Sequence, residues 1–336
     1  MDMTLSKDFE KRIFGFSNNA EFEDLAFSLF RYQYRQNELY KNYVQSLHID
    51  PENIRSVHDI PFLPIGLFRS HRVTTGDWEP ELVFESSGTT QTVNSRHYIK
   101  SAALYRESFL HAFRLFYGPV EDYAVIGLLP SYLERQHSSL VYMVNELIHM
   151  SGHPESGFYL YEHEALHYRL SELEQREQPV LLIGVTFALL DFAEAYAMQL
   201  RHTIVMETGG MKGRRTELTR PEVHQLLKER LGVAQVHAEY GMTELLSQAY
   251  AKRDGIFQCP PWMRVFLRDE SDPLHTFGAE QPLPANGVIN VIDLANIHSC
   301  AFLATEDIGR LYDNGRFEVL GRTDNSALRG CSLMVS

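Results

Sequence analysis

Short apolar runs alternate with helix-periodic stretches through most of the chain. The apolar runs are typical of β-strands and lie at residues 82–84, 123–129, 180–185, 203–206, 233–237 and 288–292. The stretches between them repeat apolar residues at helical spacing, at residues 102–116, 138–150, 187–200 and 221–231. This alternation predicts an α/β protein with largely parallel sheets. Such sheets bind ligands at the carboxyl ends of their strands.

The N-terminal part of the chain is predicted to be helical. Asn18 and Glu21 have the spacing of a capping box. Apolar residues then recur at helical spacing as far as Leu47, so the pattern predicts one long helix over residues 18–47.

Composition excludes several classes of protein. The chain has 336 residues, 44% of them hydrophobic and 22% charged, as in ordinary globular proteins. A net charge of −13 argues against nucleic acid and anionic lipid as general partners. We find no signal peptide and no apolar run of membrane-spanning length, so we expect a cytoplasmic protein. Three scattered cysteines, Cys259, Cys300 and Cys331, suggest reduced thiols, and we expect no zinc site.

A hydroxyl-rich loop follows the first predicted strand. It consists of Ser86, Ser87, Gly88, Thr89 and Thr90. Hydroxyls and the free N–H groups of a glycine turn suit phosphate oxygens. The loop is neither a Walker A loop nor a G-x-G-x-x-G loop, because the lysine and the glycine spacing are missing. On composition alone a solvent loop is the alternative.

A second motif follows the predicted strand at residues 233–237. It reads Tyr240, Gly241, Met242, Thr243 and Glu244. The tyrosine ring can stack on a base, the threonine can hold a phosphate and the glutamate can hold Mg²⁺. Alternatively, the motif is a turn that starts a helix capped by its threonine.

Asp307 and Arg322 form the third candidate group. A carboxylate can accept two hydrogen bonds from a ribose diol, and Arg322 can reach the same sugar or a phosphate. The alternative is a β-hairpin around Asp313, Asn314 and Gly315, a strong turn signal. His237 can act as a base or orient a carboxylate, and a structural histidine is the other interpretation.

In this order, the three motifs resemble the adenylate-forming superfamily of acyl-CoA synthetases, adenylation domains and luciferase. The resemblance implies ATP and Mg²⁺ as cofactors, with pyrophosphate on the hydroxyl loop, adenine beside Tyr240, Mg²⁺ on Glu244 and ribose on Asp307. It implies a large α/β domain with parallel-rich sheets and a small β-rich lobe near the C-terminus. The family's loop usually carries a lysine that is missing here, and Arg96 is the candidate substitute.

Several segments resemble one branch, the acyl-protein synthetases of bacterial luminescence fatty-acid reductase complexes. They include residues 61–71, 129–135 and 208–215, with Gly209, Gly210 and Lys212, and the ending around Cys331. The branch implies activation of a fatty acid as acyl-AMP and acyl transfer to Cys331. It further implies delivery to an acyl-CoA-reductase-type protein, acyl carrier or other thiol. Glu244, Lys212 and His237 are the other expected catalytic residues.

The same resemblance sets the expected domain organisation. We expect residues 1–80 to form a helical segment packed on an adenylate-forming core at residues 81–336. The chain ends twelve residues after Asp324, so we expect the family's C-terminal swinging domain to be absent. Phe187, Leu189 and Leu190 are examples of apolar residues expected to line an acyl slot.

Other functions remain open at this point. An acyl-CoA ligase would pass the acyl group directly to CoA, and an acyltransferase would pass it to a carrier protein. A catalytically weak, acyl- or nucleotide-binding subunit of a reductase complex is an alternative outside enzymes. In that case Cys331 could be a small buried apolar residue. The sequence specifies no oligomeric state.

Overall fold

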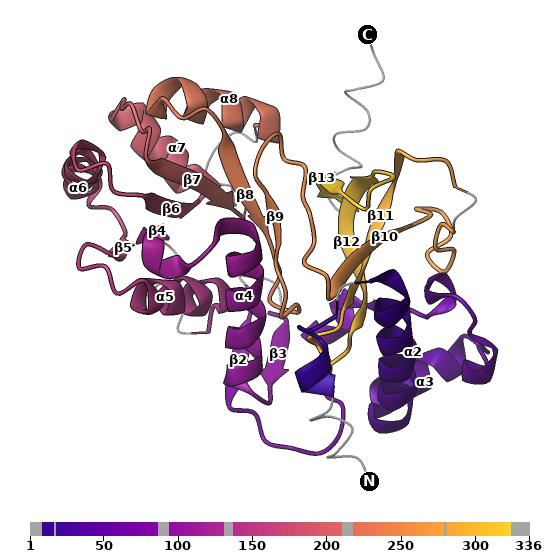
Figure 1. The fold of residues 1–336 in the computed structure, drawn as a ribbon. Helices are drawn as coiled ribbons and strands as arrows, with labels where there is room; N and C mark the ends of the chain where they lie inside the picture. The colour runs from indigo at the N-terminus through magenta and orange to yellow at the C-terminus, as the bar shows by residue number, and fades with distance from the viewer. Residues whose placement is uncertain are drawn as a thin grey trace. The chain divides into compact units, whose positions relative to one another are not determined.

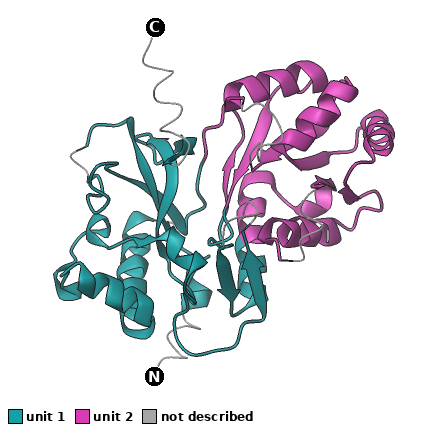
Figure 2. Cartoon of the chain, turned by 180° about the vertical axis from the view of Figure 1, so that it is seen from behind, with its two compact units in different colours: residues 1–108, 242–247, 258–336 teal, residues 109–241, 248–257 magenta. Residues whose placement is uncertain are grey.

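The computed structural model describes residues 9–16, 18–86, 94–130, 137–209, 218–278 and 281–323. The chain divides into two compact units (Figure 2). Unit 1 comprises residues 1–108, 242–247 and 258–336, and unit 2 comprises residues 109–241 and 248–257. The boundary expected near residue 80 stays a prediction, since these units divide the chain elsewhere.

Unit 2 is built on a six-stranded sheet in the described part of the chain. Its strands, in spatial order, are β5 (Gly157–Tyr159), β4 (Ala124–Leu128), β6 (Val180–Val185), β7 (Thr203–Thr208), β8 (Val236–Tyr240) and β9 (Ala249–Ala251). The first five are parallel, and β9 is antiparallel to β8. Both β4 and β6 are buried along their whole length, as expected for parallel strands covered on both faces.

Helices cover the two faces of this sheet. They are α5 (Ser139–Ser151), α6 (His163–Gln175), α7 (Thr186–Ala195) and α8 (Arg220–Leu231), with α4 (Ala102–Tyr117) shared by the units. The chain runs outward from β4 to β5 and in the opposite direction from β6 to β8. Right-handed crossovers therefore place α5 and α7 on opposite faces, as Figure 1 shows. Ligands favour the strand ends near such a reversal.

Unit 1 contains a mostly antiparallel sheet. Its strands are β1 (Leu63–Pro64), β12 (Phe302–Leu311), β11 (Ala285–Asp293), β10 (Met263–Arg268) and β13 (Phe317–Arg322), the last paired with β12. Only β1 among these described strands is parallel to its partner. A separate hairpin joins β2 (Leu82–Glu85) to β3 (Arg96–Ile99). Short 3-10 helices lie at Pro51–Asn53, Val57–Asp59, Ile65–Arg69 (η3) and, in unit 2, Val120–Asp122.

The prediction of one long N-terminal helix is wrong. Two helices, α2 (Asn19–Gln36) and α3 (Glu38–Ser46), meet at Asn37, whose backbone is extended. The buried Asn37 side chain accepts a hydrogen bond from Tyr40 N at 3.0 Å and caps α3. Its amide also donates to the carbonyl of Ser299 at 3.1 Å. A tertiary contact therefore breaks a pattern that looks continuous in sequence. At the other end, Asn18 caps α2 as predicted.

The α/β fold class is confirmed, and each predicted strand and later helix overlaps an observed element. Boundaries differ, since α7 ends at Ala195 and β8 extends to Tyr240. The pattern missed α6, β10 and β12. Within the described residues, no helix is long and apolar enough to cross a bilayer.

We predict that Asn37→Ala lowers the free energy of unfolding by about 2 kcal/mol, because it removes a helix cap and a buried hydrogen bond to the carbonyl of Ser299. Asn18→Ala is the matched control, since it removes an exposed cap with one hydrogen bond and should cost about 1 kcal/mol. Urea denaturation followed by circular dichroism measures both. Equal losses would show that the buried contacts of Asn37 contribute nothing.

Candidate active site

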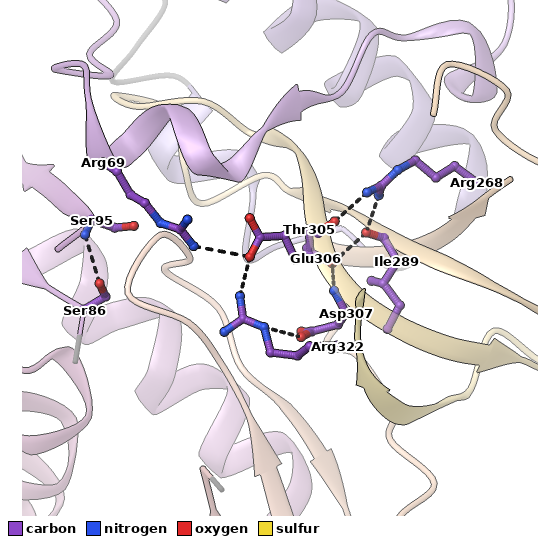
Figure 3. A network of polar contacts seen from close by, with 9 residues as sticks. All are labelled: Arg69, Ser86, Ser95, Arg268, Ile289, Thr305, Glu306, Asp307 and Arg322. Carbon is purple, nitrogen blue, oxygen red and sulfur yellow. Dashed lines mark hydrogen bonds and ion pairs between the residues drawn. The ribbon is translucent and has the colours of Figure 1, made fainter. Parts of the chain in front are cut away.

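An irregularity between β11 and β12 shapes the candidate site in unit 1. The register shifts at Ile289, whose carbonyl accepts hydrogen bonds from the Thr305 hydroxyl at 2.7 Å and from Arg268 Nη1 at 3.0 Å. Arg268 Nη2 also donates to the Thr305 carbonyl at 2.6 Å. The Thr305 hydroxyl accepts from Asp307 N at 3.1 Å. These bonds hold the stretch from Thr305 to Asp307 in a defined conformation (Figure 3).

Glu306 lies where two segments meet along one edge of β12. Strand β1 pairs with β12 as far as Ala304, and β13 pairs with it from Asp307 onward. Arg322, at the end of β13, places Nη2 2.6 Å from Glu306 Oε2 and Nε 3.7 Å from Asp307 Oδ1. Arg69, at the end of η3, places Nη2 3.3 Å from the same Glu306 oxygen. The predicted pair of Asp307 and Arg322 is therefore assembled, and the hairpin alternative is also correct.

Glu244 is linked to Ser86 through Ser95 and to the two arginines by their charge. The Glu244 side chain is buried and hydrogen-bonded to the Ser95 side chain. Burial raises the pKa of Glu244, while the Ser95 bond and the charges of Arg322 and Arg69 oppose the rise. Ser95 N in turn donates to the Ser86 hydroxyl at 2.9 Å. Unit 1 thus connects Ser86, Glu244 and the two arginines.

The backbone of the second motif is held by two side chains that sequence reasoning missed. His97 Nδ1 lies 2.8 Å from the Thr243 carbonyl, and burial lowers the His97 pKa to about 4. The ring is therefore neutral, and Nδ1 carries the proton because a carbonyl only accepts. Asn296 Nδ2 donates to the Glu244 carbonyl at 2.8 Å. Both contacts come from the tertiary structure, since His97 and Asn296 lie 146 and 52 residues away in sequence from the groups that they hold.

In unit 2, a buried glutamate lies under Gly241. The Glu239 carboxylate accepts a hydrogen bond from the Thr208 hydroxyl. Burial raises the pKa of Glu239 to about 7, the Thr208 bond opposes the rise, and the charge of Glu207 adds to it. A Cβ at position 241 would lie 2.5 Å from Glu239 Oε1. A larger residue here would therefore displace the Glu239 carboxylate. Sequence reasoning missed Glu239.

Glu207 is a second buried carboxylate at the carboxyl end of β7. Arg220 Nε lies 2.9 Å from Oε1, and the Thr186 hydroxyl donates to Oε2 at 2.9 Å. Burial alone would raise the pKa of Glu207, but His224 and Arg220 together hold it below its ordinary value. The same Thr186 hydroxyl lies 3.1 Å from the carbonyl of Gly209, whose φ is +75°. Gly209 thus begins the next loop in a conformation that favours glycine.

Two predicted residues of unit 2 have structural contacts. The Tyr240 ring is buried, 5.8 Å from the ring of Phe257. His237 Nδ1 lies 3.2 Å from the Tyr117 hydroxyl, and burial lowers the His237 pKa to about 4. This neutral, packed ring favours the structural interpretation of His237.

The remaining residues predicted from the sequence are buried or half-buried, ion-paired, or outside the described part of the chain. Met242 follows Gly241 directly and is half-buried. Phe187, Leu189 and Leu190 are buried in α7. The Arg96 guanidinium pairs with Glu85 at 3.1 Å. Predicted residues outside the described part of the chain are Ser87, Gly88, Thr89, Thr90, Gly210, Lys212 and Cys331.

The described residues contain no group of three or more histidine, cysteine, aspartate or glutamate side chains placed to hold a metal ion. The absence of zinc and the binding of Mg²⁺ by Glu244 both stay predictions. One carboxylate is compatible with Mg²⁺, because this ion is usually bound by one or two carboxylates together with substrate phosphates.

Residues 9–117 match the family model described as "Acyl-protein synthetase, LuxE". This match confirms the resemblance inferred from the motifs. It covers about a third of the chain. A comparison with curated proteins gives no match.

Solved structures of adenylate-forming enzymes share the fold. A 2-hydroxyisobutyryl-CoA ligase in complex with its acyl-AMP covers 94% of this chain and 68% of its own, with 13% identity and a TM-score of 0.63. ATP-bound MatB from Rhodopseudomonas palustris covers 73% and 49%, with 17% identity and a TM-score of 0.53. MenE from Bacillus subtilis with ATP and magnesium covers 72% and 50%, with 17% identity and a TM-score of 0.50. The chain spans about half the length of the latter two.

We predict that Gly241→Ala destabilises the protein by roughly 1–3 kcal/mol, because the new Cβ displaces the Glu239 carboxylate. Gly157→Ala is the control, since its Cβ would meet nothing within 4 Å. In a Glu239→Ala background, the penalty of Gly241→Ala should largely disappear. Thermal unfolding of the four variants tests this. An unchanged penalty in that background would contradict the steric explanation.

We predict a pH-dependent difference in stability between the wild type and Glu239→Gln. Between pH 4.5 and about 7, the folded state holds a proton on Glu239 that the unfolded state has lost. The contribution of this group to stability therefore falls as the pH rises through that window, by at most about 3 kcal/mol. Urea titrations at several pH values measure the difference. The pKa of Glu207 is lowered and that of Tyr117 is raised, so both groups titrate outside this window. A pH-independent difference would contradict the prediction.

Proposed function

We propose that this chain uses ATP and Mg²⁺ to convert a fatty acid to acyl-AMP and then transfers the acyl group to a thiol. The observation that carries the proposal is the connected group in unit 1. The Ser95 side chain is hydrogen-bonded to the buried Glu244, and the Ser86 hydroxyl accepts from Ser95 N. The charges of Arg69 and Arg322 act on the same glutamate. The LuxE family match and the adenylate-forming fold support the same reaction.

Each part of the group suits one part of ATP. The Ser86 hydroxyl, and the hydroxyls and glycine that follow it in sequence, suit phosphate oxygens. The largely buried Asp307 lies beside Arg322, and its carboxylate can accept hydrogen bonds from ribose hydroxyls. Arg322 can stabilise negative charge on the phosphates. Bound Mg²⁺ on Glu244 would neutralise phosphate charge.

The first step replaces a poor leaving group with a good one. A fatty carboxylate oxygen attacks the α-phosphorus of ATP, the bond to the β-phosphate oxygen breaks, and pyrophosphate leaves. Negative charge builds on the phosphate oxygens in the transition state, and fixed cations stabilise it. The Glu244 carboxylate, whose pKa is raised by burial, becomes ionised more readily beside cations.

The second step requires a reactive thiolate. The thiolate attacks the acyl carbonyl, and AMP leaves with the electrons of the carbon–oxygen bond. Burial raises the pKa of Cys300 to about 12 and raises that of Cys259 further, so neither is a thiolate near neutral pH. The resemblance to the acyl-protein synthetases assigns the acyl group to Cys331, and the raised pKa values of the other two thiols are consistent with this. Delivery to an acyl-CoA-reductase-type partner is part of the same proposal.

A CoA ligase is the second candidate. The fold similarity to a CoA ligase over 94% of this chain favours it. In that case CoA attacks the acyl-AMP directly, and Cys331 is dispensable.

We predict that incubation with ATP, Mg²⁺ and a panel of fatty acids adds one acyl group to the protein, measured by intact-mass spectrometry. Hydroxylamine should remove the adduct, and Cys331→Ser should abolish it. Cys259→Ser and Cys300→Ser are the matched controls. Glu244→Gln should slow ATP–pyrophosphate exchange about 100-fold.

The outcomes separate the candidates. Release of acyl-AMP without an adduct, with CoA-dependent acyl-CoA formation in Cys331→Ser, would establish the ligase. No exchange with any carboxylic acid would overturn the proposed reaction and favour a non-catalytic binding subunit.

A further inference from the structure

We propose that Arg69 is a pyrophosphate-binding residue that Glu306 holds in place until the β- and γ-phosphates of ATP arrive. The inference rests on the proposed function and adds a residue and a competing ion pair to the same site. It follows from charge balance, from the route of the chain and from the exposure of the Arg69 side chain.

The charges of the site require a further cation. Its described carboxylates are Glu244, Glu306 and Asp307, and ATP adds a strongly negative triphosphate. No lysine or arginine stands between Ser86 and Arg96 in the sequence. Arg96 pairs with Glu85, and its side chain is 59% exposed. Its partner Glu85 is the last residue of β2, so Arg96 pairs outside the three carboxylates of the site, whereas Arg69 pairs with one of them.

Arg69 reaches the site by a short, fixed path. Leu63 and Pro64 pair with β12, and η3 continues from them to Arg69. A Cβ at Gly66 would lie 3.9 Å from Glu306 Oε1, so η3 passes directly beside this carboxylate. The path ends with the Arg69 guanidinium directed at Glu306, as Figure 3 shows. The charge of Arg69 also acts on Glu244.

The two arginines have different surroundings. Arg322 binds both Glu306 and Asp307, and it stands across the hairpin from Asp307, the proposed ribose ligand. Both side chains are partly exposed, 53% for Arg322 and 44% for Arg69, but of these two carboxylates Arg69 pairs with Glu306, at 3.3 Å. N–H groups of Arg69 are thus accessible to an incoming anion. A planar guanidinium with accessible N–H groups suits bidentate binding of phosphate oxygens.

Glu306 then acts as a competitor for the same guanidinium. An ion pair at this exposure contributes little to stability. A triphosphate with Mg²⁺ offers Arg69 more acceptor oxygens than one carboxylate. Arg69 therefore transfers from Glu306 to the phosphates when ATP binds, and returns when pyrophosphate leaves.

Binding measurements by calorimetry in the presence of Mg²⁺ test this inference on the full chain, with pyrophosphate, ATP and AMP as probes. Arg69→Gln should weaken pyrophosphate and ATP binding about 10-fold or more. AMP binding should stay within about two-fold. Arg69→Lys should give an intermediate loss, because the charge remains and the planar fork does not. Arg310→Gln is the matched control, since Arg310 is 43% exposed and also pairs with a glutamate.

Glu306→Gln separates this role from a structural one. If Glu306 competes with phosphate, its removal should strengthen pyrophosphate binding about 2- to 5-fold. A purely structural ion pair would make Glu306→Gln and Arg69→Gln change binding in the same direction. Circular dichroism and urea denaturation verify that each variant is folded.

Two results would overturn the inference while leaving the proposed reaction intact. One is weaker pyrophosphate binding by Glu306→Gln, and the other is an equal loss of AMP and pyrophosphate affinity in Arg69→Gln. The proposed reaction fails separately if the wild type binds these ligands but forms no acyl-AMP. A wild type that binds none of the three probes would overturn both.

Discussion

The break in pairing between β11 and β12 is the constraint on which the unit 1 site depends. Successive residues of a regular strand point to opposite faces, yet Glu306 and Asp307 both reach Arg322. The β12 strand departs from regular pairing at two places. One register shift lies at Ile289 of β11, and the other lies between Ile308 and Gly309 of β12. The Thr305 hydroxyl and the Arg268 guanidinium satisfy the carbonyl groups that the irregularity leaves unpaired. Polar groups inside the sheet thus hold two carboxylates at its edge.

The described part of the structure contains three buried glutamates whose neighbours differ, so their pKa values differ as well. Glu207 stays ionised because Arg220 lies beside it. Glu239 has no such cation in its described surroundings, so burial raises its pKa towards neutrality. Glu244 is intermediate, with a hydroxyl partner and two more distant arginines. These three glutamates therefore have three different pKa values, which their burial and their neighbours determine.

Much of the fold was predictable, because buried parallel strands and amphipathic helices leave clear patterns. The α2–α3 break was not, because Asn37 is explained by Ser299, which is 262 residues away in sequence. The site residues likewise fall into those that the sequence predicted and those that only the structure revealed. Glu244 and Asp307 stand in recognisable motifs, whereas Arg69 and His97 act through contacts that local sequence does not encode. Long-range pairing brings Arg69 to Glu306, and burial alone explains the neutral ring of His97.

The pairing of β1 with β12 has a consequence for biogenesis. Leu63 finds its partner Leu303 only after 239 intervening residues have been synthesised. The sheet of unit 2 is complete by Ala251, so it can fold on the ribosome first. Until β12 is synthesised, Phe30 of α2 and Tyr40 of α3 lack the ring of Phe302, against which they pack in the folded protein. A ribosome-bound chain of this length therefore has a definite reason to engage a chaperone at its N-terminal segment.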